Sequence, residues 1–254
     1  MGVFKTRGDV QALARPERRT DLSAHRKYKE QALEACRGLA ACGLGPGIGG
    51  HVSVRVPGKE LFYTNAFEKC FEEMRAEDIL LLDFEGNVLE SNRAVSLGLT
   101  FHHGIYKQRP DVGAIVHSHG FWLTAQAAFG RPLRTFNNLA TFFYERTCIS
   151  PNDDFASIGP ALRQGDVAII IPWHGAITVG KDIAEAAALH VTMDYAARLD
   201  VTLPAEAPVI PHDMCLELRA LVERADYLAL TWELVRRKGR DAFDGQRVVP
   251  RLAA

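Results

Sequence analysis

Apolar side chains along the chain follow two different periods, which predicts helices alternating with strands. Residues 23–43 repeat apolar positions every three or four residues and stop at Gly43, as an amphipathic helix does. Elsewhere apolar residues alternate with polar ones or form short unbroken runs, the patterns of half-buried and fully buried strands. The strands predicted in this way cover residues 52–56, 61–64, 79–83, 114–119 and 167–171, with short return strands after 87 and after 174.

Helical patterns also occur between and after the strands. They cover residues 97–109, 121–130, 181–201 and 213–240. Residues 132–160 show neither period, and we expect them to be irregular. Hairpins interleaved with helices are typical of one α/β domain layered around a mainly antiparallel or mixed sheet. The expected organisation is a flexible arm at residues 1–22, this domain at 23–240 and a tail at 241–254.

Composition narrows the class of protein. The 254 residues carry a formal net charge of −1, which gives no support for a nucleic-acid partner or an anionic membrane surface. No run of 18 apolar residues is present, and the N-terminus lacks the apolar core of a signal peptide. The five cysteines form no CxxC pair, which fits a reducing compartment. We therefore expect a cytoplasmic protein that acts on a small molecule, without nucleic acid or membrane as partner.

Candidate chemistry lies where two predicted strands end in histidine. His117 and His119 are two residues apart, so on a strand both imidazoles project from one face. Taken alone, such a pair can equally be two ordinary surface histidines. His174 ends the next apolar run, and three imidazoles in one crevice with an open position are typical of a catalytic metal site. His51 lies in a glycine-rich turn, where the backbone can approach a ligand, and is a candidate substrate contact.

Four segments together carry a resemblance to a known family. They read GGHVSVR, EDILLLDFEGNVLE, HHGIYKQRPDVGAIVHSHG and PWHGAITVGKDIAEAAALHVTMDYAAR. In this order and spacing the chain resembles the class II aldolase/adducin family over about residues 25–235. The resemblance implies a three-layer αβα sandwich and a homotetramer with active sites near subunit interfaces. It also implies one divalent metal ion per subunit, held by His117, His119 and His174, with zinc, manganese and iron as candidates.

Departures from the family pattern bear on the substrate. Gly98 stands where the sugar-phosphate aldolases of this family carry a catalytic glutamate, three residues before a Phe-His pair. His51, Leu97 and Glu68 stand at positions of the family's phosphate-binding elements, and the charge of Glu68 would repel phosphate. We therefore expect sugar phosphates not to be substrates. The family also contains enzymes that use the metal without a sugar phosphate, and the sequence is placed in that decarboxylase-like branch.

The leading hypothesis is a metal-dependent carbon–carbon lyase. The expected reaction is decarboxylation of a hydroxylated aromatic or heteroaromatic carboxylic acid through a metal-stabilised enolate. One alternative is an Fe(II)-dependent oxygenase acting on an aromatic 2-oxo or hydroxy acid. The remaining alternatives are a sugar-phosphate aldolase or epimerase with a substitute acid, and a non-catalytic module like adducin.

Side chains for this chemistry are assigned by residue type. Tyr144 and His51 are candidate proton donors, and Glu145 is a candidate base or orienting group, or else an ion-pair partner of Arg146. Arg55 could bind a substrate carboxylate, although an arginine on a strand is more often solvated. The other candidate substrate contacts are Ser96 and Trp173. The aromatic residues suit a flat substrate or simply form core, and these are Trp122, Phe142, Phe143, Tyr144 and Trp173.

Overall fold

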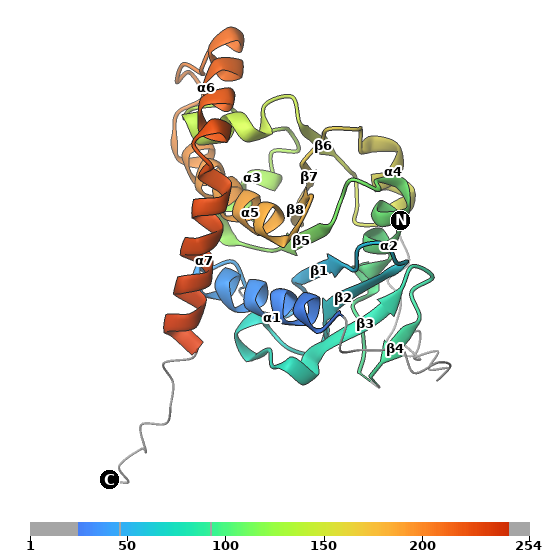
Figure 1. The fold of residues 1–254 in the computed structure, drawn as a ribbon. Helices are drawn as coiled ribbons and strands as arrows, with labels where there is room; N and C mark the ends of the chain where they lie inside the picture. Colours follow the sequence, from blue (N-terminus) through green and yellow to red (C-terminus); the bar gives the residue numbers. More distant parts are fainter. Residues whose placement is uncertain (1–24, 46, 92, 244–254) are drawn as a thin grey trace.

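An eight-stranded mixed sheet lies at the centre of the computed structural model, which describes residues 25–45, 47–91 and 93–243 (Figure 1). The strand order is β4-β3-β2-β1-β5-β8-β7-β6. Neighbouring strands are antiparallel except β6 and β7, which run parallel. The strands are β1 (His51–Arg55), β2 (Leu61–Asn65), β3 (Ile79–Asp83), β4 (Val88–Glu90), β5 (Ala114–Ser118), β6 (Thr147–Ile149), β7 (Ala168–Ile171) and β8 (Gly175–Gly180).

Helices cover both faces of this sheet. The α-helices are α1 (Arg26–Ala41), α2 (Thr100–Gln108), α3 (Phe121–Ala127), α4 (Phe155–Ala161), α5 (Ile183–Thr202), α6 (His212–Arg224) and α7 (Tyr227–Phe243). Short 3-10 helices lie at η3 (Phe71–Glu73), η4 (Ala76–Asp78), η5 (Leu97–Leu99) and η6 (Asn138–Phe143). None of the helices in the described part of the chain is both long and apolar enough to cross a membrane.

Side-chain alternation along the strands divides the core in two. On β5, Val116 points to the core shared with α1, α5 and α7, whereas Ile115 points to the core shared with α2 and α4. Ile169 and Ile170 of β7 divide between the same two cores. The expected three-layer αβα sandwich around a mixed sheet is therefore confirmed (Figure 1).

Two expectations about the second half of the chain are wrong. Residues 132–160 are not irregular throughout, because they contain η6, β6 and α4. Strand β6 has three residues and pairs with β7 alone in the sheet. It is therefore too short for an alternating pattern in the sequence to predict it. The last helix is two helices, α6 and α7, because the backbone leaves the helical conformation at Asp226, whose φ is 50°.

The structure describes the chain near the C-terminal limit expected for the domain, at residue 240, but not residues 23 and 24 at its N-terminal limit. Helix α7 ends at Phe243, and the expected domain limits stay predictions. The arm expected at residues 1–22 and residues 244–254 of the expected tail lie outside the described residues.

Candidate metal centre

Strand β5 aims His117 and Ser118 at opposite sides of the sheet. His117 lies on the face covered by α2, and its ring contacts Phe101 of that helix at a centroid distance of 6.0 Å. His119 follows the last residue of the strand and returns to the face of His117, as the period of two predicts. His174 comes from the turn between β7 and β8, beside β5 in the sheet.

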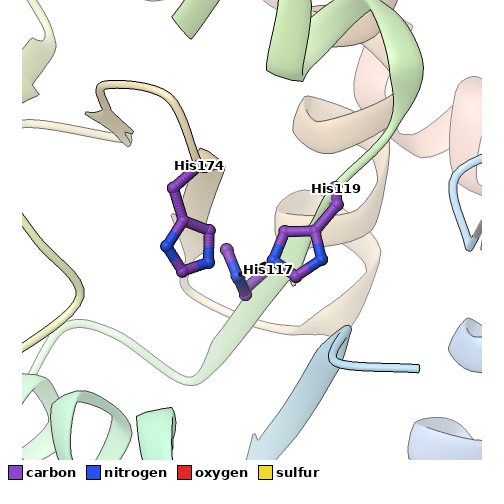
Figure 2. A group of neighbouring side chains, drawn as sticks. All are labelled: His117, His119 and His174. Atoms are coloured by element: carbon purple, nitrogen blue, oxygen red, sulfur yellow. Dashed lines mark hydrogen bonds between the residues drawn. The ribbon is translucent and has the colours of Figure 1, made fainter. Parts of the chain in front are cut away.

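The three imidazoles converge on one point (Figure 2). One ring nitrogen from each of His117, His119 and His174 lies within 4.8 Å of the other two. The Nε2 atoms of His117 and His119 are 3.1 Å apart. Two nitrogens bound to one tetrahedral zinc ion at 2.0–2.1 Å would be about 3.3 Å apart, so the donor set fits a divalent ion of this size.

Hydrogen bonding leaves the correct nitrogen of His117 for a metal. Its Nδ1 lies 2.9 Å from the carbonyl oxygen of Ala176 and donates to it, so Nε2 carries the free lone pair. Burial, together with neighbouring His51, His119 and His174, holds the pKa of His117 well below its ordinary value. The neutral form, which ligates metals, is therefore the form present at neutral pH.

A second buried histidine supports the same strand from behind. The Oγ of Ser118 lies 2.8 Å from Nε2 of His190 on α5, and Nδ1 of His190 lies 3.0 Å from Oγ1 of Thr178 on β8. Burial lowers the pKa of His190 to about 3, so this histidine is neutral. The network satisfies the polar atoms between the sheet and α5 and ties the segment between the two ligands to α5.

His51 borders the centre as expected from the sequence. It pairs with His117 across β1 and β5, and their ring centroids are 5.1 Å apart. Its Nδ1 is buried without a hydrogen-bond partner among the described residues. Burial and the neighbouring histidines, His102 first among them, hold its pKa well below the ordinary value.

Behind His51 lies a chain of polar groups that the sequence interpretation did not identify. The Oγ of Ser53 lies 2.7 Å from Nδ1 of His102 and 2.7 Å from the hydroxyl of Tyr106. The ring of His102 lies 5.5 Å from that of His51, and its Nε2 has no partner among the described residues. The signal in the sequence is the spacing of His102 and Tyr106, which places both on one face of α2.

Ser96 and Trp173 differ in what they contact. The Oγ of Ser96 accepts a hydrogen bond from the backbone nitrogen of Gly98 and so fixes the turn before α2. Trp173 precedes His174 with a left-handed φ of 59°, and 82% of its surface is exposed. Their roles as substrate contacts stay predictions.

Arg55 is not brought to the histidines. It ends β1, whereas His51 begins the strand, and four residues of strand span about 13 Å. Its guanidinium donates to the carbonyl oxygens of Tyr106 and Val112 and lies 5.0 Å from the centroid of the Phe84 ring. These contacts give Arg55 a structural place at the opposite end of the strand.

Tyr144 and Glu145 both contact helix α6 within the chain, and their catalytic roles stay predictions. The hydroxyl of Tyr144 lies 3.1 Å from Nδ1 of His212 on α6, and the Glu145 carboxylate lies 3.8 Å from the same atom. Phe142 and Phe143 are buried in the core next to α5 and α7 and do not line a pocket at the histidines. Of the aromatic residues that could line a substrate pocket or form core, Phe142 and Phe143 are therefore core, because η6 turns these two side chains inward.

A family model described as the class II aldolase and adducin N-terminal domain matches residues 30–201. The chain is 30% identical over 177 residues to 5-methylthioribulose-1-phosphate/5-deoxyribulose-1-phosphate aldolase of Rhodospirillum rubrum, covering 65% of this chain and 76% of that protein. It is 30% identical over 159 residues to L-fuculose phosphate aldolase of Methanococcus maripaludis, covering 61% of this chain and 84% of the other.

Among solved structures, L-fuculose 1-phosphate aldolase from Glaciozyma antarctica superposes with a TM-score of 0.77 at 26% identity. That superposition covers 91% of this chain and 96% of the other. The names of all three relatives are those of sugar-phosphate aldolases. These comparisons therefore give no support to the decarboxylase branch expected from the sequence.

Proposed function

The chain belongs to the class II aldolase and adducin family and is a lyase of that family, and we propose that its reaction is an aldol cleavage. The proposed substrate is a polyhydroxylated ketone derived from a sugar, and the proposed cofactor is one divalent metal ion. The observation that carries the proposal is the convergence of His117, His119 and His174 on one point. The names of the relatives support aldol cleavage over the decarboxylation and oxygenation considered from the sequence.

The three histidines would hold the metal as neutral ligands. A metal bound there would act as a Lewis acid toward a substrate carbonyl oxygen. His117 is buried and oriented by the carbonyl of Ala176, which keeps its ring from turning away. His119 and His174 are only half-buried, so the side of the centre that they form is the side open to a substrate.

The glycine-rich turn before β1 supports a substrate place beside the centre. A Cβ atom at Gly49 would lie 3.1 Å from Cε1 of His119, so the backbone of this turn passes close to the ligand. Gly47 and Gly49 both have a φ of 103°, a conformation that glycine adopts without steric cost and that allows the backbone to approach a substrate closely. His51 follows this turn and is proposed as a substrate contact.

Assembly is proposed to be a homotetramer. Two large apolar side chains close in sequence to the candidate ligands are exposed. The exposed fraction is 69% for Phe121 and 82% for Trp173. Exposed apolar side chains of this size favour burial against another molecule. Light scattering after size exclusion measures the mass in solution, and a monomeric protein at micromolar concentration would contradict this part of the proposal.

The test of function is a cleavage assay with three groups of substrates on metal-loaded protein. The groups are ketose 1-phosphates, the same ketoses without phosphate, and hydroxylated aromatic acids. We expect an aldehyde from the ketose 1-phosphates or from the unphosphorylated ketoses, and no CO₂ from the aromatic acids. The comparison of the two ketose groups shows whether the enzyme recognises phosphate. Release of CO₂ without any aldehyde would replace the aldolase by the decarboxylase.

A further inference from the structure

The space beside Gly98 is bordered by a histidine and by a carboxylate from another part of the chain. A Cβ atom at Gly98 would lie 2.9 Å from Cε1 of His51 and 3.1 Å from Oδ2 of Asp153. Asp153 belongs to the loop between β6 and α4, about 55 residues further along the chain. Because Gly98 has no side chain, the Asp153 carboxylate can lie close to His51, which borders the metal centre.

The loop that carries Asp153 is anchored on both sides. Before it, the backbone nitrogen of Ser150 donates to the carbonyl oxygen of Ile170, and its hydroxyl donates to the carbonyl oxygen of Asn152. After it, Asp154 accepts a hydrogen bond from the backbone nitrogen of Ala156 and caps α4. The backbone around Asp153 is thus held in place by contacts that do not involve its own side chain.

The Asp153 carboxylate itself is uncommitted. It is half-buried, and no hydrogen bond or ion pair joins it to another residue in the described ranges. A carboxylate that lies beside Gly98 and His51, and that no cation in the described ranges neutralises, is available to a substrate bound at the centre.

We propose that Asp153 is the residue that moves the proton in the aldol cleavage proposed above, on which this inference rests. As a carboxylate it takes the proton of the substrate hydroxyl while the adjacent carbon–carbon bond breaks and the new aldehyde forms. The electron pair of that bond stays on the carbon next to the carbonyl. The carboxylic acid then gives the same proton to that carbon, which restores the carboxylate and balances the reaction.

Other candidates near the centre are less suited to this step. His117, His119 and His174 would have their ring nitrogens engaged by a metal or by hydrogen bonds. Tyr144 and Glu145 contact His212 on α6 instead. Within the described part of the chain, Asp153 combines an ionisable oxygen, partial burial and freedom from other partners beside Gly98.

The experiment compares Asp153→Asn and Asp153→Glu with Asp154→Asn as a matched control. Asn caps a helix as well as Asp does, so the control keeps α4 while removing a neighbouring charge. Three quantities are measured: the affinity for Zn²⁺ alone, the rate of ketose cleavage, and deuterium uptake from D₂O by the carbon next to the carbonyl of dihydroxyacetone or its phosphate. Thermal unfolding of each variant checks that it is folded.

Asp153→Asn is expected to lower both cleavage and deuterium uptake by about 10²–10⁴-fold with Zn²⁺ affinity within threefold of wild type. Asp153→Glu should recover part of the uptake, and the control should keep both rates. Uptake unchanged in Asp153→Asn would overturn the role, and a large loss of Zn²⁺ affinity would make Asp153 a ligand instead. If the wild-type protein takes up deuterium, loses this uptake in Asp153→Asn and cleaves no ketose, the proposed function is rejected and the role of Asp153 stands. If the wild-type protein shows neither uptake nor cleavage, the proposed function and the role of Asp153 are both rejected.

Discussion

His51 on β1 lies directly opposite His117 on β5, and their rings pack with centroids 5.1 Å apart. This pairing makes the start of β1 one wall of the metal centre. It also brings the glycine-rich turn that precedes His51 against His119. The register between these two strands therefore places a candidate substrate loop beside the candidate ligands.

Replacement of one ligand should abolish stoichiometric metal binding. In His119→Ala the remaining two imidazoles leave two coordination positions empty, so the affinity for Zn²⁺ should fall by more than the roughly 10–100-fold typical of an outer-shell change. Isothermal titration with Zn²⁺ and elemental analysis measure this loss. His212→Ala, on exposed α6, is the control and should bind metal like wild type. Equal binding by the two variants would remove His119 from the site.

A methyl group at Gly175 should damage the metal centre through the backbone. The Cβ of Gly175→Ala would lie 2.6 Å from the carbonyl oxygen of Ser118, so β5 and the turn that carries His174 must separate. We expect a loss of about 1–3 kcal/mol in the free energy of unfolding together with weaker Zn²⁺ binding.

Gly113→Ala is the matched control for that experiment. Its Cβ would meet the carbonyl oxygen of Lys181 at the other end of the same two strands. This variant should also lose stability, measured by urea unfolding, but should keep its Zn²⁺ affinity once folded. If both variants lose metal binding equally, the effect reflects general destabilisation of the sheet.

The buried Asp200 should be important for stability. Its Oδ2 and Oδ1 accept hydrogen bonds from Nη1 of Arg131 and Nε of Arg134 at 2.7 and 2.6 Å, and its side chain is fully buried. Asp200→Ala leaves two partly buried guanidinium groups without their counter-charge and should cost about 3–5 kcal/mol in the free energy of unfolding. The exposed Glu206→Gln serves as control and should stay within about 0.5 kcal/mol of wild type. Urea unfolding of all three proteins checks the difference.

Stability should fall as the pH drops below about 6.5, partly because of His190. Its pKa is about 3 in the folded protein, so between pH 3 and pH 6.5 the unfolded chain binds a proton that the folded chain excludes. From pH 7 to pH 5 this effect amounts to roughly 2 kcal/mol in the free energy of unfolding.

The variant His190→Gln isolates this contribution. Glutamine does not titrate, so the difference in free energy of unfolding between pH 7 and pH 5 should be smaller by that amount than in wild type. Unfolding at both pH values measures it. The same pH dependence in both proteins would assign the effect to other groups.

Local periodicity was sufficient to predict most elements and the convergence of the three candidate ligands. The alternation of a strand puts His117 and His119 on one face whatever the rest of the chain does, and the apolar run before His174 marks a second buried strand. The layered α/β architecture follows in the same way, since amphipathic helices must cover a sheet whose strands are buried on both sides.

Contacts between distant segments were decided only by the tertiary structure. Strand β6 forms because β7 offers it hydrogen bonds, and the polar residues around Asp153 carry no period that shows where a carboxylate points. Arg55 has the right chemistry for a site, but it lies at the far end of β1, and Tyr144 contacts His212 on α6 through the turn after η6. Residue type and spacing determine local direction, whereas the packing of loops against the sheet determines which polar groups share one site.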